Sequence, residues 1–169
     1  MAGERVTTGT ERWRQVQSII AIDPGSTHNG IAIFAVVMGG DGVARLECRL
    51  TTEHTPEGMF DSLRVWGAAH GNAKGGFDVM VVEKFVLYPE KAASLSWSTL
   101  GTVEVIGVLR ERCRQDGTAF VLQPASAKKA TEGQLKARGI ALKSKGSGGH
   151  AKDAELHGWH YWLRMRAGL

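Results

Sequence analysis

Residues 18–34 read SIIAIDPGSTHNGIAIF, and this stretch decides how the rest of the chain is interpreted. Apolar, mostly β-branched residues run up to Asp23, the Pro24-Gly25 turn follows, and a second apolar run begins at Ile31. This pattern predicts two strands of a hairpin joined by a polar loop. Asp23 then stands where a buried strand meets the loop, and a carboxylate there needs a partner, a hydrogen bond or a metal ion. The alternative is that Asp23 caps its own turn, as Asp before Pro-Gly often does.

Turn signals and hydrophobic periodicity divide the rest of the chain into further strands and helices. Residues 43–50 alternate apolar and charged side chains, which is typical of a strand with one buried face. The expected strands cover about 18–22, 30–37, 43–50, 77–82 and 118–122, and the expected helices about 56–71, 91–115, 126–131, 134–141 and 150–166. This order predicts an α/β fold with a mixed five-stranded sheet, three antiparallel strands then two parallel, and helices on both faces.

The composition is typical of a globular domain without a membrane segment. The chain has 169 residues, of which 43% are hydrophobic and 22% charged, enough for a single domain with a real core. No apolar run reaches the roughly 18–20 residues that span a bilayer, and the N-terminus lacks a secretory signal. Cys48 and Cys113 lie far apart in no metal-binding spacing, which favours free thiols in a reducing compartment. We therefore expect a cytoplasmic protein with no membrane partner.

Positive charge is concentrated in the last third of the chain. Residues 1–109 carry 9 Lys and Arg against 12 Asp and Glu, a net charge of −3, whereas residues 110–169 carry 12 against 5, a net charge of +7. Such clustering favours a polyanion partner, with nucleic acid as the first candidate, although a solvated basic face is the alternative. The candidate phosphate-binding residues in this region are Lys128, Lys129, Lys143, Lys145 and Lys152.

A second carboxylate ends the fourth expected strand, at Glu83. If that strand is a parallel neighbour of the first, Glu83 lies beside Asp23, and the two like charges repel unless a cation lies between them. His150 and Asp153 are three residues apart at the start of the last helix, so both point to one side. Three carboxylates and a histidine predict a hard-cation site for Mg²⁺ or Mn²⁺, and two such ions suit phosphodiester cleavage. We interpret His157, one turn further on, as a partly buried surface histidine, with support of the site as the alternative.

Three short motifs resemble those of RuvC-type Holliday junction resolvases, which belong to the RNase H-like nuclease superfamily. Residues 20–32, IAIDPGSTHNGIA, resemble the first motif; residues 81–85, VVEKF, resemble the second; and residues 150–154, HAKDA, resemble the last. The order of the expected elements is also similar to the RNase H-like fold. The resemblance covers about residues 18–165, so we expect residues 18–169 to form the nuclease domain. Residues 1–17 then form a partly ordered N-terminal extension, which the compact bacterial enzymes lack.

The resemblance implies a homodimeric, metal-dependent endonuclease that resolves four-way DNA junctions. It assigns catalysis and two Mg²⁺ ions, replaceable by Mn²⁺, to Asp23, Glu83, His150 and Asp153. His150 either binds the metal, where imidazole favours Mn²⁺, or takes a proton from the attacking water. The helix at about 94–114 would make much of the dimer contact. Candidate residues for stacking on bases are Phe85, Leu87 and Tyr88, with core packing as the alternative for the first two.

A compact RuvC-like chain with an added N-terminal segment also resembles the bacteriophage-encoded versions of these enzymes, and this similarity extends the expected substrates to other branched DNA. Three alternatives remain open at this point. One is a ribonuclease of the same fold that acts on RNA–DNA hybrids, and another is a non-catalytic module that binds branched DNA. The third is a sugar kinase or actin-like ATPase, whose phosphate loop also contains an Asp-x-Gly sequence, although such enzymes use two domains of this kind.

Overall fold

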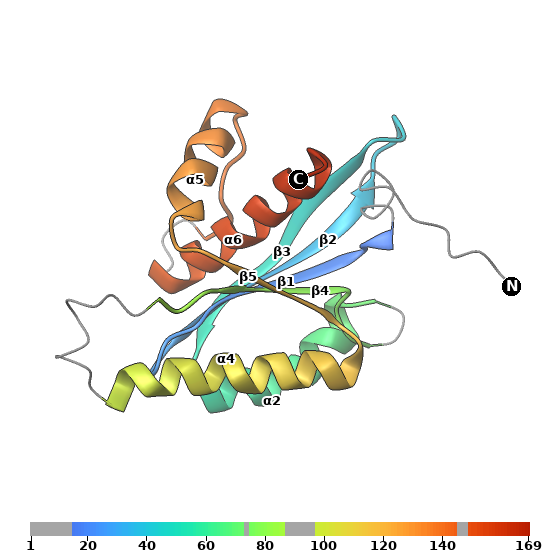
Figure 1. Ribbon diagram of the computed structural model, residues 1–169. Helices are drawn as coiled ribbons and strands as arrows, with labels where there is room; N and C mark the ends of the chain where they lie inside the picture. Colours follow the sequence, from blue (N-terminus) through green and yellow to red (C-terminus); the bar gives the residue numbers. More distant parts are fainter. Residues whose placement is uncertain (1–14, 73–74, 87–96, 145–148) are drawn as a thin grey trace, which may run out of the picture.

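Five strands form a single mixed sheet in the computed structural model, which describes residues 15–72, 75–86, 97–144 and 149–169 (Figure 1). The strand order is β3-β2-β1-β4-β5. β1 pairs antiparallel with β2, as β2 does with β3, whereas β4 runs parallel to both β1 and β5. The predicted sheet is therefore confirmed. The strands span Ser18–Asp23 (β1), Asn29–Met38 (β2), Ala44–His54 (β3), Val79–Glu83 (β4) and Ala119–Gln123 (β5).

Helices cover both faces of the sheet, as predicted. The α2 helix (Pro56–His70) and the α4 helix (Trp97–Asp116) lie on one face, and the α5 helix (Ala127–Ala137) and the α6 helix (Gly149–Arg166) lie on the other (Figure 1). Each face has its own core: Phe34 and Trp159 pack in the one beneath α6, and Ile33 and Leu109 in the one beneath α2 and α4. In the part of the chain that the structure describes, no helix is long and apolar enough to cross a membrane.

The bounds of two helices, α4 and α5, differ from the predicted bounds or lie partly outside the described residues. The two short helices expected at 126–131 and 134–141 form one helix, α5, because an exposed Gly133 does not interrupt it. Among the described side chains of α4, at 101–116, the buried ones include Val105, Leu109 and Cys113, whereas Val103 is 48% exposed. The expected first turns of α4, at 91–96, and the extension at 1–14 lie outside the described residues.

A β-bulge in β3 reverses which face its side chains occupy. Ile33 of β2 lies opposite Leu50, but Phe34 lies opposite Cys48, so Arg49 is an extra residue in the strand. The alternation expected over residues 44–50 therefore breaks: Ala44 belongs to the core beneath α6, but Leu50 packs on the opposite core. Beyond the bulge, β3 continues four residues past its predicted end to His54.

Small residues let α6 approach β2 closely. A Cβ atom on Gly30 would lie 1.9 Å from the backbone oxygen of His150 at the start of α6. Further along the helix, a Cβ atom on Gly158 would lie 2.1 Å from the ring of Phe34. Both distances are far shorter than any allowed contact, so the two glycines set the depth at which α6 packs on the sheet.

The Gly30→Ala substitution should therefore destabilise the protein by about 1–3 kcal/mol or more, because the backbone of α6 must move away from β2. The matched control is Gly133→Ala in α5, where an added Cβ atom has no neighbour within 4 Å. That control should gain up to about 1 kcal/mol from helix propensity. Urea unfolding of the two variants and the wild type measures both effects, and equal stabilities of Gly30→Ala and wild type would contradict the packing argument.

Candidate active site

Two carboxylates lie at the same end of the sheet because two parallel strands end there. Asp23 is the last residue of β1 and Glu83 is the last residue of β4. Ile22 lies opposite Val82 in the parallel register, so the next residue of each strand brings Asp23 beside Glu83. Asp153 of α6 completes the group, since one carboxylate oxygen from each of the three residues lies within 4.8 Å of the others. The predicted convergence of these three acids is thus observed.

His150 joins this group through Asp23. Its ring nitrogen Nδ1 lies 2.6 Å from Oδ2 of Asp23, and its side chain is 48% exposed, whereas that of Asp23 is almost fully buried. A hydrogen bond to Asp23 fixes the orientation of the imidazole at the mouth of the site. The turn after Asp23 is held in a similar way, because the buried Asn29 accepts a hydrogen bond from the backbone N–H of Gly25 at 3.2 Å.

Lys128 of α5 extends into the acidic group. Its Nζ atom lies 2.8 Å from Oε2 of Glu83 and 2.5 Å from Oδ2 of Asp153. The partial burial of Lys128 opposes the charged form, but the hydrogen bonds to the two carboxylates outweigh it and raise the pKa of the ammonium group. The sequence suggested Lys128 as a phosphate contact, and the structure places it as a counter-charge among the acids.

Asp23 and Glu83 lie in different electrostatic environments. Burial, aided by repulsion from Glu83, raises the pKa of Asp23 to about 6, although the hydrogen bond to His150 and the charge of Lys128 work against this. Burial also acts to raise the pKa of Glu83, but hydrogen bonds from His157 and Lys128 outweigh it and lower that pKa to about 2. The ionised form of Asp23 therefore needs additional positive charge nearby, whereas the ionised form of Glu83 is already stabilised by His157 and Lys128.

The interpretation of His157 as a surface residue is wrong. Its side chain is fully buried, with Nε2 2.8 Å from Oε2 of Glu83 and Nδ1 2.9 Å from Oε1 of Gln123. The four-residue spacing from Asp153 was the available signal, since it places both residues on one face of α6. Gln123 carried no such signal, because its position depends on the parallel pairing of Glu83 with Gln123.

Glu53 is a further residue that the sequence did not indicate. Its Oε1 atom accepts a hydrogen bond from the backbone N–H of Ala151 at 3.0 Å, at the start of α6. An acid at a helix N-terminus satisfies a free N–H group and interacts favourably with the helix dipole. Glu53 reaches α6 only because the bulge at Arg49 shifts the register of β3, and regular alternation would direct it to the other face.

The donor set fits a divalent cation. Three carboxylate oxygens within 4.8 Å of one another are the hard ligands that Mg²⁺ and Mn²⁺ prefer, and a buried Asp23 beside Glu83 leaves negative charge that one lysine does not balance. Asp23, Glu83 and Asp153 would hold the ion or ions. His150 lies next to this group rather than within it, because its contact is with an oxygen of Asp23.

The structure describes some of the remaining predicted DNA contacts. Lys129 and Lys143 are exposed, and Phe85 is half-buried just after β4. Lys152 forms an ion pair of 2.7 Å with Glu132, and both side chains are about half exposed. Tyr88, Leu87 and Lys145 lie outside the described residues.

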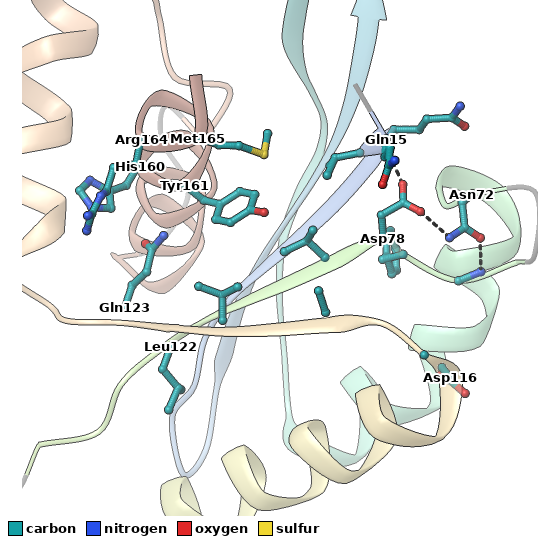
Figure 2. A pocket seen from close by; sticks show the side chains of 18 of the residues that line it. Gln15, Asn72, Asp78, Asp116, Leu122, Gln123, His160, Tyr161, Arg164 and Met165 are labelled. Atoms are coloured by element: carbon teal, nitrogen blue, oxygen red, sulfur yellow. Dashed lines mark hydrogen bonds between the residues drawn. The ribbon is translucent and has the colours of Figure 1, made fainter. Parts of the chain in front are cut away.

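A pocket of about 1580 Å³ runs along β5 and is separate from the acidic group (Figure 2). The two acidic residues that line the pocket already have partners within the protein. Asp78 accepts hydrogen bonds from Ser18 and Asn72, and Asp116 forms an ion pair with Arg112. Gln123 lines this pocket. It is also connected to Glu83 of the acidic group through His157. Volume alone therefore does not locate the chemistry, and we assign it to the converging carboxylates.

Comparison with solved structures shows that the fold is similar to that of RuvC. No protein-family model and no curated protein sequence matches the chain. Thermus thermophilus RuvC, solved in complex with a Holliday junction substrate and also in a second structure, aligns with a TM-score of 0.60 at 18% identity. Each alignment covers 90% of this chain and 97% of the other. The yeast mitochondrial Holliday junction resolvase Ydc2 aligns with a TM-score of 0.47 at 11% identity, over 90% of this chain and 80% of that chain.

The raised pKa of Asp23 makes a prediction about stability in the absence of metal. Its folded-state value of about 6 exceeds the ordinary value of 3.8, so ionised Asp23 destabilises the native state progressively as the pH rises through this range. In EDTA, Asp23→Asn should therefore raise the melting temperature at about pH 8 and raise it less at about pH 4. The control is Asp61→Asn, an exposed acid on α2, which should change little at either pH. A melting temperature of Asp23→Asn below that of wild type at both pH values would contradict this account.

Proposed function

We propose that this protein is a metal-dependent endonuclease that resolves Holliday junctions and cuts other branched DNA. The observation that carries the proposal is the convergence of Asp23, Glu83 and Asp153 from β1, β4 and α6, with ligand atoms within 4.8 Å of one another. The RuvC fold supports it, because the three motifs that resemble those enzymes supply these same residues. A DNA substrate also agrees with the expected cytoplasmic location.

Asp23, Glu83 and Asp153 would hold two Mg²⁺ ions, with Mn²⁺ as a substitute. When bound, two such ions supply Lewis acidity to both the attacking and the leaving oxygen in phosphodiester hydrolysis. The product ends would be a 5′-phosphate and a 3′-hydroxyl, as the resemblance implies. Before ions enter, Lys128 offsets the repulsion between Glu83 and Asp153, since its Nζ atom contacts both carboxylates.

His150 is suited to move a proton. A carboxylate accepts hydrogen bonds but does not donate them, so the 2.6 Å contact with Oδ2 of Asp23 places the proton on Nδ1 of His150. In the neutral ring this leaves Nε2 as the basic nitrogen, and the half-exposed side chain gives that nitrogen access to water. We propose that Nε2 of His150 accepts a proton from the attacking water, with Asp23 holding the required tautomer.

The basic surface around α5 would hold the phosphates of the junction arms. Lys129 and Lys143 are exposed, and together with Lys145 and Lys152 they are the proposed phosphate contacts. Phe85 lies two residues after Glu83 and is half-buried, and we propose that it stacks on bases near the cut. Tyr88 stays a sequence-based candidate for the same role. We also propose a homodimer, because two sites are needed for paired nicks. The exposed Val103 and Val108 on α4 suit such a contact.

Cleavage of a synthetic mobile four-way junction tests the proposal most directly. With Mg²⁺ or Mn²⁺ the wild type should make symmetric paired nicks, and EDTA should abolish them. Asp23→Asn should lose cleavage while retaining junction binding, because it removes a metal ligand and not a DNA contact. Asp61→Asn is the control and should cleave normally. Normal cleavage by Asp23→Asn, or a preference for an RNA–DNA hybrid over the junction, would overturn the proposal.

The basic surface predicts a defined salt dependence. The double variant Lys129→Ala, Lys143→Ala should bind the junction more weakly, and the slope of log K against log salt should decrease by about 1 for each lysine removed. Arg45→Ala is the control, because Arg45 is exposed near the β2–β3 turn and paired with Asp41 at 2.6 Å. Binding measured by fluorescence anisotropy at several salt concentrations checks this. Equal slopes for the double variant and the wild type would exclude these lysines from the DNA contact.

A further inference from the structure

Three side chains from three elements form a buried hydrogen-bonded chain behind the acidic group. Glu83 and Gln123 end the parallel strands β4 and β5 and lie directly opposite each other in their register. Gln123 is directed from β5 toward α6, whereas its neighbour Leu122 points to the other face (Figure 2). His157 of α6 lies between the two, with Nε2 2.8 Å from Glu83 and Nδ1 2.9 Å from Gln123.

The proton on Nε2 of His157 is determined by its partners. A carboxylate accepts hydrogen bonds, so in the 2.8 Å contact the ring donates from Nε2 to Glu83. On the other side of the ring, Nδ1 lies 2.9 Å from the side-chain amide of Gln123, which can present either its oxygen or its nitrogen after a flip. Both arrangements keep Nε2–H donating to Glu83. Gln123 therefore holds the imidazole in place, and the imidazole holds the carboxylate.

Both donors act on the same oxygen of Glu83. His157 and Lys128 each contact Oε2 at 2.8 Å. Among the described residues, none donates a hydrogen bond to Oε1 of Glu83. Two donors on one oxygen restrict rotation of the carboxylate and leave the second oxygen available for a cation. The side chain of His157 is 0% exposed, so water does not replace its donor role.

We propose that His157, held by Gln123, is a positioning residue that orients Glu83 as a divalent-metal ligand. This inference rests on the proposed function for the assignment of Glu83 to the metal site. Hydrogen-bond partners of metal ligands contribute about 10–100-fold in metal affinity or activity. A residue that only filled the core would be replaceable by an apolar side chain of similar size without loss of metal affinity, and this difference separates the two roles.

Mn²⁺ binding to the full chain, measured by titration calorimetry, tests the proposal without any DNA. His157→Leu removes the donor and should weaken Mn²⁺ binding about 10–100-fold. His157→Gln, whose amide N–H can take the place of Nε2–H, should recover most of the affinity. Gln123→Leu leaves His157 in place but loosens it, and should give a smaller loss. Ser18→Ala is the matched control, because Ser18 is also a buried donor to a carboxylate, Asp78, at the opposite end of β1.

Melting curves in EDTA and junction binding without metal accompany each titration. Junction binding should be unchanged in all four variants, since none touches the basic surface. If His157→Leu does not fold, the comparison of His157→Gln and Gln123→Leu with wild type decides the matter. Mn²⁺ affinities of folded His157→Leu and Gln123→Leu equal to that of wild type would overturn the positioning role.

The failures of the two proposals are distinguishable. If the wild type binds Mn²⁺ but cuts no branched DNA, the proposed function fails, and the Mn²⁺ affinities still decide the role of His157. If the wild type cuts junctions and His157→Leu has the same Mn²⁺ affinity and the same Mn²⁺ dependence of cleavage, the positioning role fails alone. Absence of Mn²⁺ binding by the wild type would overturn both the metal site and the role of His157.

Discussion

The parallel pairing of β1 with β4 is the constraint on which the site depends. It joins residues that are 60 positions apart in the chain, Asp23 and Glu83, at the ends of two buried strands. Backbone hydrogen bonds and apolar side chains on both faces hold the strands together, so the carboxylates cannot move apart to relieve their repulsion. The energy of the fold thus maintains a local charge arrangement that would be unfavourable by itself, and a cation makes it favourable.

The α6 helix brings the other half of the site, and its depth on the sheet decides whether the halves meet. Gly30 allows the helix backbone to lie against β2, and Glu53 accepts a hydrogen bond from the first turn. His150 and Asp153 then face Asp23 and the sheet end, and His157 reaches Glu83 one turn later. Packing and function are coupled here, because the same contacts that bury the helix place its polar side chains.

The negative charges of Glu83 and Asp23 are compensated to different degrees by neighbouring donors. Glu83 has His157 and Lys128 as donors and a lowered pKa, whereas Asp23 is buried, with a raised pKa and a single short contact to His150. Ionised Asp23 lowers the stability of the fold, and a cation held by the acids would offset that cost. Lys128 lies among the acids as a counter-charge, with its Nζ atom in contact with Glu83 and Asp153.

The sequence by itself predicted a mixed five-stranded sheet with helices on both faces and singled out the acids as candidates, because strand and helix periodicity and Asp-Pro-Gly turn chemistry are local signals. The same signals placed Asp23 and Glu83 at the ends of apolar strands and Asp153 in the first turn of a helix. The tertiary structure decided the rest. The bulge that redirects Glu53 follows from the register between β2 and β3, and the burial of His157 follows from its contacts with Glu83 and Gln123 on separate strands. Those outcomes depend on pairing between distant segments, which local sequence patterns do not encode.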